Sequence, residues 1–222
     1  MVGITLTGAD ERTPLDLLQG LVKQGAEIGL LYTFSPDNRR RYPRLGWIME
    51  VAQTLGRRAA IHVCGARARV ALIGGKLRYL SDFAGRFQIN GTLAPQDLWA
   101  ASQELIGHEI ITQHTPANAT LAGLVIPDHC LLVDASGGRG LVPLRWEKPD
   151  TFKLVGYAGG LSTGNLAIEL PRIAVAAGGP NWWIDAETGL RSDDWFDAGK
   201  AEAVLAAFLA WRDGACAEKN DA

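Results

Sequence analysis

Three pairs of side chains that can do chemistry are spaced two residues apart in short apolar segments. The pairs are His62 with Cys64, Gln88 with Asn90, and Asp185 with Glu187. Residues i and i+2 of a β-strand face the same side, so each pair would project together. A thiol beside an imidazole can form a thiolate, which makes Cys64 assisted by His62 a candidate general base. The alternative interpretation is that Cys64 is a small buried hydrophobe and His62 a hydrogen-bonded core residue.

Imidazole and carboxylate groups also suit zinc or manganese. The candidates for a metal-dependent site are His62, Asp185 and Glu187, with His114 as a fourth. The sequence has no His-x-x-x-His spacing to support this alternative. We therefore expect no resident metal and no cofactor.

Two glycine-containing turns follow apolar runs in the last third of the chain. Gly159 and Gly160 come after one run, and Thr188 and Gly189 come after the next. Glycine lets the backbone approach a ligand closely, and a helix that starts there points free N–H groups at an anion. We predict that these four residues bind phosphate, the alternative being that the glycines only supply tight turns.

Arginines in two loops are candidates for binding further negative groups. Arg39 and Arg41 belong to an Arg-Arg-Arg run that either clamps an anionic substrate or lies in solvent. Arg139 lies in a Gly-Gly-Arg-Gly segment, with the same two interpretations.

Eight short apolar segments predict the strands that position these groups. They are centred near Thr5, Leu31, Val63, Gln88, Ile111, Leu132, Val155 and Ile184. Helical spacing of apolar residues over 14–24, 45–55, 95–106 and 198–211 predicts helices between or after them. Alternating strands and helices, with eight strands in all, favour an α/β fold, a single (β/α)₈ TIM barrel, whose active site lies at the carboxyl ends of the strands. No Gly-x-Gly-x-x-Gly turn follows the first strand, which weakens the alternative of an open dinucleotide-binding sheet.

Composition sets the remaining expectations. A chain of 222 residues with 47% hydrophobic side chains fills one core, so we expect a barrel over residues 1–214 and a frayed tail over 215–222. The formal net charge of −2 gives no general attraction to nucleic acid or to an anionic membrane. The start of the chain has no basic region followed by an apolar core, and three scattered cysteines do not form a disulfide framework. We expect a cytoplasmic protein, a monomer or homodimer, with a phosphorylated small-molecule substrate.

Six segments, in the same order along the chain, resemble the motifs of the phosphoribosylanthranilate isomerase family. The first three are Ile4-Thr5-Leu6-Thr7-Gly8, Ser35-Pro36 and Gln88-Ile89-Asn90-Gly91. The last three are Leu131 to Asp134 with Gly137-Gly138-Arg139-Gly140, Ala158-Gly159-Gly160-Leu161 with Asn165, and Ile184 to Gly189. The resemblance covers nearly the whole chain and implies a barrel that performs an Amadori rearrangement of a phosphorylated ribosylamine in tryptophan biosynthesis.

The resemblance also implies roles for single residues and shows where the family pattern is lost. Asp134 matches the general acid that protonates the ribose ring oxygen. Thr7 stands where the family has its basic cysteine, and a hydroxyl is far too weak an acid to replace a thiol unaided. The predicted function is an isomerase with Asp134 as acid and a relocated base, either Cys64 with His62 or a carboxylate such as Glu187. The alternatives are a non-catalytic barrel that binds a phosphorylated metabolite, or the metal-dependent enzyme described above.

Overall fold

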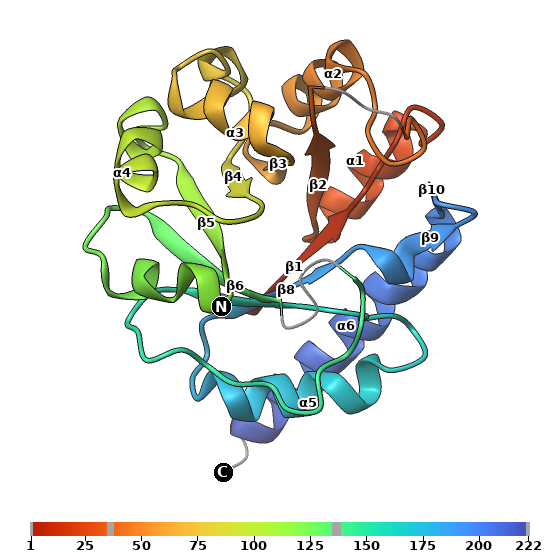
Figure 1. Cartoon of the computed structure of the whole chain (residues 1–222). Helices are drawn as coiled ribbons and strands as arrows, with labels where there is room; N and C mark the ends of the chain where they lie inside the picture. Colours follow the sequence, from red (N-terminus) through yellow and green to blue (C-terminus); the bar gives the residue numbers. More distant parts are fainter. Residues whose placement is uncertain (1, 35–37, 135–138, 221–222) are drawn as a thin grey trace.

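The computed structural model describes residues 2–34, 38–134 and 139–220, and the side chains up to residue 215. Eight parallel strands close into a barrel in chain order, with β1 hydrogen-bonded to β8 (Figure 1). The strands are β1 (Val2–Thr7), β2 (Glu27–Tyr32), β3 (Ala59–Val63), β4 (Arg86–Ile89), β5 (Glu109–His114), β6 (His129–Asp134), β7 (Val155–Ala158) and β8 (Trp182–Ala186). The predicted eight-stranded barrel is confirmed.

Helices surround the strands on the outside (Figure 1). They are α1 (Leu15–Lys23), α2 (Leu45–Leu55), α3 (Ala66–Ile73), α4 (Pro95–Glu104), α5 (Leu166–Ala177) and α6 (Ala198–Asn220), with short 3₁₀ helices η1 (Gly56–Arg58), η2 (Arg78–Leu80), η3 (Pro116–Gly123) and η4 (Thr188–Leu190). Outward-facing strand residues such as Leu6, Leu30 and Phe87 are fully buried against these helices. The main hydrophobic core is therefore the layer between strands and helices.

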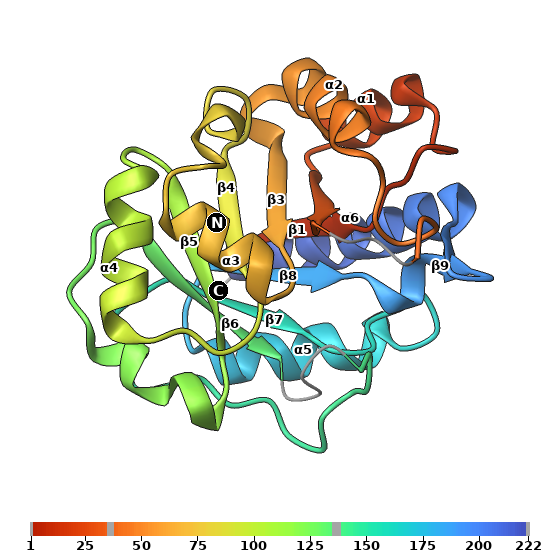
Figure 2. The ribbon, with the colours of Figure 1, turned by 45° about the horizontal axis from the view of Figure 1, so that its top comes forward.

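The connection from β6 to β7 departs from the expected alternation of strand and helix. Its described residues, 139–154, form neither a helix nor a strand, and they run over the outside of the barrel in Figure 2. Pro143 and Pro149 disfavour a continuous helix there. Trp146 fills the space instead, because its indole N–H donates to Glu169 Oε2 at 2.7 Å and its ring packs edge-on against Tyr157.

The inside of the barrel is filled by its own layer of side chains. Ile111, Cys130, Leu132 and Trp183 form a second apolar cluster there. A Cβ at Gly156 would lie 2.2 Å from the Trp183 indole, so β7 needs glycine at this position to admit the ring.

An ion network built on the largely buried side chains of Arg86 and Glu27 closes the amino-terminal end of the barrel. Arg86 lies over the Trp183 ring at 4.3 Å and pairs with Glu27 at 3.1 Å and Glu109 at 2.8 Å. Thr5 also donates to Glu27, at 2.7 Å. Because this network closes the amino-terminal end, a ligand would bind at the carboxyl-terminal end of the barrel.

After β8 the chain forms a hairpin that the sequence did not predict, β9 (Arg191–Ser192) with β10 (Trp195–Phe196). Its turn residues Asp193 and Asp194 both have positive φ angles, which aspartate tolerates better than most residues. Helix α6 then continues to Asn220, beyond the predicted barrel limit at 214, so fraying of the terminal segment stays a prediction. In the part of the chain that the structure describes, no helix is long and apolar enough to cross a membrane.

Candidate active site

A cavity of about 460 Å³ opens at the carboxyl ends of the strands. Side chains and turns from β2 to β8 contribute to its wall. Among the predicted site residues, the lining includes Arg41, Cys64, Gln88, Asn90, Asp134, Gly159, Gly160, Asp185, Glu187 and Thr188. The barrel thus brings together groups that are far apart in the sequence.

The glycines after β7 form one side of this cavity. Gly159 has φ of +130° and Gly160 has φ of +61°, a backbone region that disfavours other residues. A Cβ on Gly159 would lie 2.8 Å from the Leu141 carbonyl oxygen, and one on Gly160 would lie 2.7 Å from the Gly140 carbonyl oxygen. Both positions therefore require glycine, because the turn packs closely against the backbone of residues 140–142, and both glycines line the cavity.

The turn after β8 packs against the turn after β7. A Cβ on Gly189 would lie 2.1 Å from the Leu161 carbonyl oxygen, which explains this glycine by close packing of the two turns. Gly189 is outside the cavity lining, whereas Thr188 is part of it. Thr188 also begins η4, and the first N–H groups of a helix have no acceptor within the helix.

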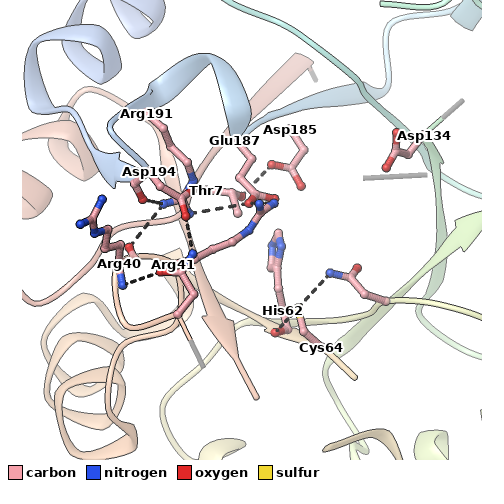
Figure 3. Close-up of polar contacts among 12 residues, drawn as sticks. Thr7, Arg40, Arg41, His62, Cys64, Asp134, Asp185, Glu187, Arg191 and Asp194 are labelled. Carbon is pink, nitrogen blue, oxygen red and sulfur yellow. Dashed lines mark hydrogen bonds and ion pairs between the residues drawn. The ribbon is translucent and has the colours of Figure 1, made fainter. Parts of the chain in front are cut away.

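Asp185 and Thr7 form a buried contact between the last strand and the first. The Thr7 hydroxyl donates to Asp185 Oδ1 at 2.6 Å, and Thr7 itself is fully buried behind the cavity wall (Figure 3). A Cβ on Gly29 would lie 2.1 Å from Thr7 Oγ1, so the glycine of β2 leaves room for the hydroxyl. Burial raises the pKa of Asp185 to about 8, although the Thr7 hydrogen bond opposes the shift.

His62 and Cys64 project from β3 as predicted, but their environments differ. Cys64 lines the cavity, whereas His62 is buried and outside the lining. The Cys64 thiol donates to the His62 carbonyl oxygen at 3.4 Å and accepts from Asn90 Nδ2 at 3.2 Å. Burial raises the pKa of Cys64 to about 12 and lowers the pKa of His62 to about 3. Both shifts favour the neutral forms and oppose a thiolate–imidazolium pair.

Side-chain amides line the cavity over β4 and β5. Gln88 Nε2 donates to Asn90 Oδ1 at 2.9 Å. Gln113 accepts from the Gly91 amide at 2.8 Å, and its Nε2 lies 3.5 Å from Asp134 Oδ2. Gln113 was not predicted as a site residue. It lies two residues after Ile111 in β5, and this spacing places it on the inner face of the barrel.

An ion-paired group of side chains forms the remaining wall. Arg41 NH2 lies 2.5 Å from Glu187 Oε1, and Arg191 NH2 lies 3.6 Å from the same oxygen (Figure 3). Arg191 also donates to the Asp194 carbonyl oxygen at 2.8 Å within the hairpin, and Arg40 donates to the Asp193 carbonyl oxygen at 3.1 Å, which joins the hairpin to the loop that carries Arg41. Arg41 is thus available at the cavity but already has an acidic partner.

The remaining predicted groups lie apart from the cavity. Arg39 and Arg139 are exposed and are not among the lining residues. Among the residues described, no three His, Cys, Asp or Glu side chains are grouped so that they could hold a metal ion. The alternative metal site, built from His62, Asp185, Glu187 and His114, is therefore not supported. Tyr42 and Arg69 also line the cavity, and no motif or residue spacing in the sequence predicted them as site residues.

Comparison with known proteins identifies the fold. No protein-family model matches the chain, and no curated protein sequence matches it significantly. The solved phosphoribosylanthranilate isomerase of Thermus thermophilus matches with a TM-score of 0.66 at 17% identity, over 94% of this chain and 99% of that one. Those of Thermotoga maritima (TM-score 0.64, 15% identity, 92% and 97% coverage) and Pyrococcus furiosus (0.60, 14%, 93% and 98%) are similar. The chain has the phosphoribosylanthranilate isomerase fold.

This likeness extends over the whole barrel, although the sequences have diverged. Thr7 ends β1, the strand that closes the barrel against β8. Its hydroxyl stands where the family resemblance expects a thiol, and it contacts Asp185 directly.

Proposed function

We propose that the protein is an isomerase of the phosphoribosylanthranilate isomerase type, which converts a phosphorylated aminoaldose into an aminoketose. The observation that carries this proposal is one cavity that combines Asp134 with the turns at Gly159, Gly160 and Thr188. A barrel of the same fold supplies the framework.

In this proposal the turns after β7 and β8 bind the phosphate. Gly159, Gly160 and Thr188 line the cavity there, and the phosphate would bind to their backbone N–H groups and to the Thr188 hydroxyl. Gly189 contributes by packing the two turns together.

Asp134 is proposed as the acid that opens the sugar ring. It lies at the end of β6, and a Cβ built on Gly159 would be 3.8 Å from Asp134 Oδ1. The glycine turn and the acid are thus adjacent, so a sugar phosphate bound at the turn presents its ring to Asp134. Gln113 would orient the carboxyl group from the other side.

The far side of the cavity would receive the substituent on the amine nitrogen. Gln88 and Asn90 offer amide groups there, and Arg41 offers a positive charge that Glu187 partly neutralises. A carboxylate on the substrate would compete with Glu187 for Arg41.

A non-catalytic barrel that binds a phosphorylated metabolite is the second candidate. It is favoured by the threonine at position 7, where the resemblance requires the base. The two candidates share phosphate binding and differ in turnover.

The test is conversion of N-(5′-phosphoribosyl)anthranilate by the purified protein, with the aminoketose product separated by chromatography. We expect turnover by the wild type and a loss of about 10²- to 10⁴-fold in Asp134→Asn. Asp128→Asn is the matched control, because Asp128 is exposed just before the other end of β6. If the wild type binds inorganic phosphate but converts neither this substrate nor other aminoaldose phosphates, the binding barrel is correct.

A further inference from the structure

We propose that Asp185 is the catalytic base of this site and that Thr7 is its positioning residue. The proposal rests on the proposed function, since it names the group that moves the proton in that reaction. It places the base on β8, one strand away from the position where the family resemblance expects it.

The contact between the two residues carries the proposal. Thr7 Oγ1 lies 2.6 Å from Asp185 Oδ1, so a carboxylate oxygen occupies the immediate neighbourhood of the expected thiol. Asp185 lines the cavity and Thr7 does not. Within residues 2–34, 38–134 and 139–220, no second donor bonds to the Asp185 carboxylate, which leaves Oδ2 for the substrate.

Asp185 and the proposed acid lie two strands apart on the wall of the same cavity. Asp134 pairs in register with Ala158 of β7, and Ala158 pairs with Asp185 of β8. Neighbouring strands are about 4.8 Å apart, so the two aspartate backbones are separated by about 10 Å. The residue between them is Ala158, whose small side chain lines the cavity, so in this proposal the sugar binds there between the two carboxyl groups. Figure 3 shows both aspartates.

The surroundings of Asp185 suit proton abstraction. Its side chain is 6% exposed, and burial raises its pKa to about 8. A carboxylate with a raised pKa is a stronger base than an ordinary one and matches a working pH near 8. The charged and titratable groups that face it are Glu27 from β2, His62 from β3, Asp134 from β6, Glu187 at the end of β8, and the two arginines that pair with Glu187, Arg41 and Arg191.

The other candidate bases are less suitable. Burial holds Cys64 as a thiol and His62 as a neutral imidazole with a pKa of about 3. Glu187 is engaged by Arg41 at 2.5 Å. Asp185 is the carboxylate in this wall that has a hydroxyl partner in place of a cation.

In the proposed reaction Asp134 and Asp185 each transfer a proton and recover their starting state. Asp134 protonates the ring oxygen, the C1–O bond breaks, and the nitrogen lone pair forms a C1=N iminium. Asp185 then takes the proton from C2, and the C2–H electrons form the C1=C2 bond of an enolamine while the iminium π electrons return to nitrogen. Asp185 returns its proton to C1, and the O2 proton goes to Asp134, which gives the ketone and restores both carboxyl groups.

The experiment compares Asp185→Asn, Thr7→Val, Thr7→Ser and Asp128→Asn with the wild type on N-(5′-phosphoribosyl)anthranilate across pH 5 to 10. We expect Asp185→Asn to lose about 10²- to 10⁴-fold in kcat with phosphate affinity retained. The wild-type kcat should rise with pH, reach half of its maximum near pH 8 and level off above about pH 9. Thr7→Val should move this limb to higher pH, because the hydrogen bond from the Thr7 hydroxyl lowers the pKa of Asp185 and valine has no hydroxyl. Thr7→Ser keeps the hydroxyl and should restore the wild-type limb.

The outcomes distinguish the assignment of Asp185 as base from the proposed isomerase function. An active wild type with Asp185→Asn above one tenth of its kcat, or with the same pH limb in Thr7→Val, overturns the assignment and leaves the proposed function standing. A folded wild type that converts no aminoaldose phosphate overturns the proposed function and the assignment with it. Activity of Asp128→Asn at the wild-type level excludes a general effect of removing a carboxyl group.

Discussion

Replacing Asp185 with asparagine should change how the stability of the protein depends on pH. Burial raises the pKa of Asp185 from 3.8 to about 8 in the folded protein, whereas in the unfolded chain the carboxyl group is in water. Between these values the folded state holds a proton that the unfolded state has released. Rising pH therefore favours unfolding, and the contribution is fully present below pH 3.8 and lost as pH rises to about 8.

The magnitude follows from the size of the shift. Each pH unit in this window costs about 1.4 kcal/mol of unfolding free energy. From pH 3.8 to pH 7 the loss is on the order of 4 kcal/mol, because Asp185 is buried and solvent screens its charge little. Asparagine has no such proton, and its side-chain oxygen can still accept from Thr7.

Urea unfolding of both proteins from pH 4.5 to 9, at constant ionic strength, measures this effect. The difference between the two unfolding free energies cancels the other titrating groups to first order. It should move in favour of Asp185→Asn by about 1.4 kcal/mol per pH unit up to pH 7.5 and then level off. Parallel curves would show that Asp185 titrates in its ordinary range and would refute the reasoning.

Three further variants or reagents test the barrel and its cavity. Gly156→Ala should lower the unfolding free energy by about 1–3 kcal/mol, because the new methyl group meets the Trp183 ring. Thermal melting measures this, with Gly164→Ala as the control, because the carbon added there makes only an ordinary contact. Gly160→Ala should weaken binding of inorganic phosphate about tenfold or more in calorimetry, because the positive φ angle and the contacts of the new methyl group with Gly140 and Val142 would distort the turn. Cys64 should resist iodoacetamide at pH 8, since burial keeps its thiol neutral, and rapid labelling found by peptide mapping would contradict the high pKa.

The barrel could be predicted because its signals are local. Short apolar runs gave the eight strands, and apolar spacing gave α2 at its observed bounds of Leu45–Leu55. Helix α3 was missed, since alternating alanine and arginine over Ala66 to Arg69 form no apolar stripe. The β9–β10 hairpin was missed because two-residue strands have no period to detect.

The lining of the cavity could be predicted only in part, for a physical reason. Strand spacing placed Gln88, Asn90 and Asp185 on inner faces, and all three line the cavity. The contact of Thr7 with Asp185 joins residues 178 positions apart and exists only because β1 closes against β8. Burial, which sets the pKa of Cys64, also arises from the closed barrel and not from its neighbours in the sequence.

The charged groups inside the barrel have different partners at its two ends. At the amino-terminal end Arg86 pairs with Glu27 and Glu109, so the buried charges there are compensated. At the carboxyl-terminal end Asp185 is buried with a hydroxyl donor and, in the described part of the chain, no paired cation. A buried carboxyl group without a cation weakens the fold above its unfolded pKa, and packing gives no reason to retain it. Perturbed carboxyl groups of this kind cluster at functional sites, and this one opens onto the same cavity as Asp134. The stability lost at neutral pH and the base strength gained therefore have one origin, the burial of Asp185 beside Thr7.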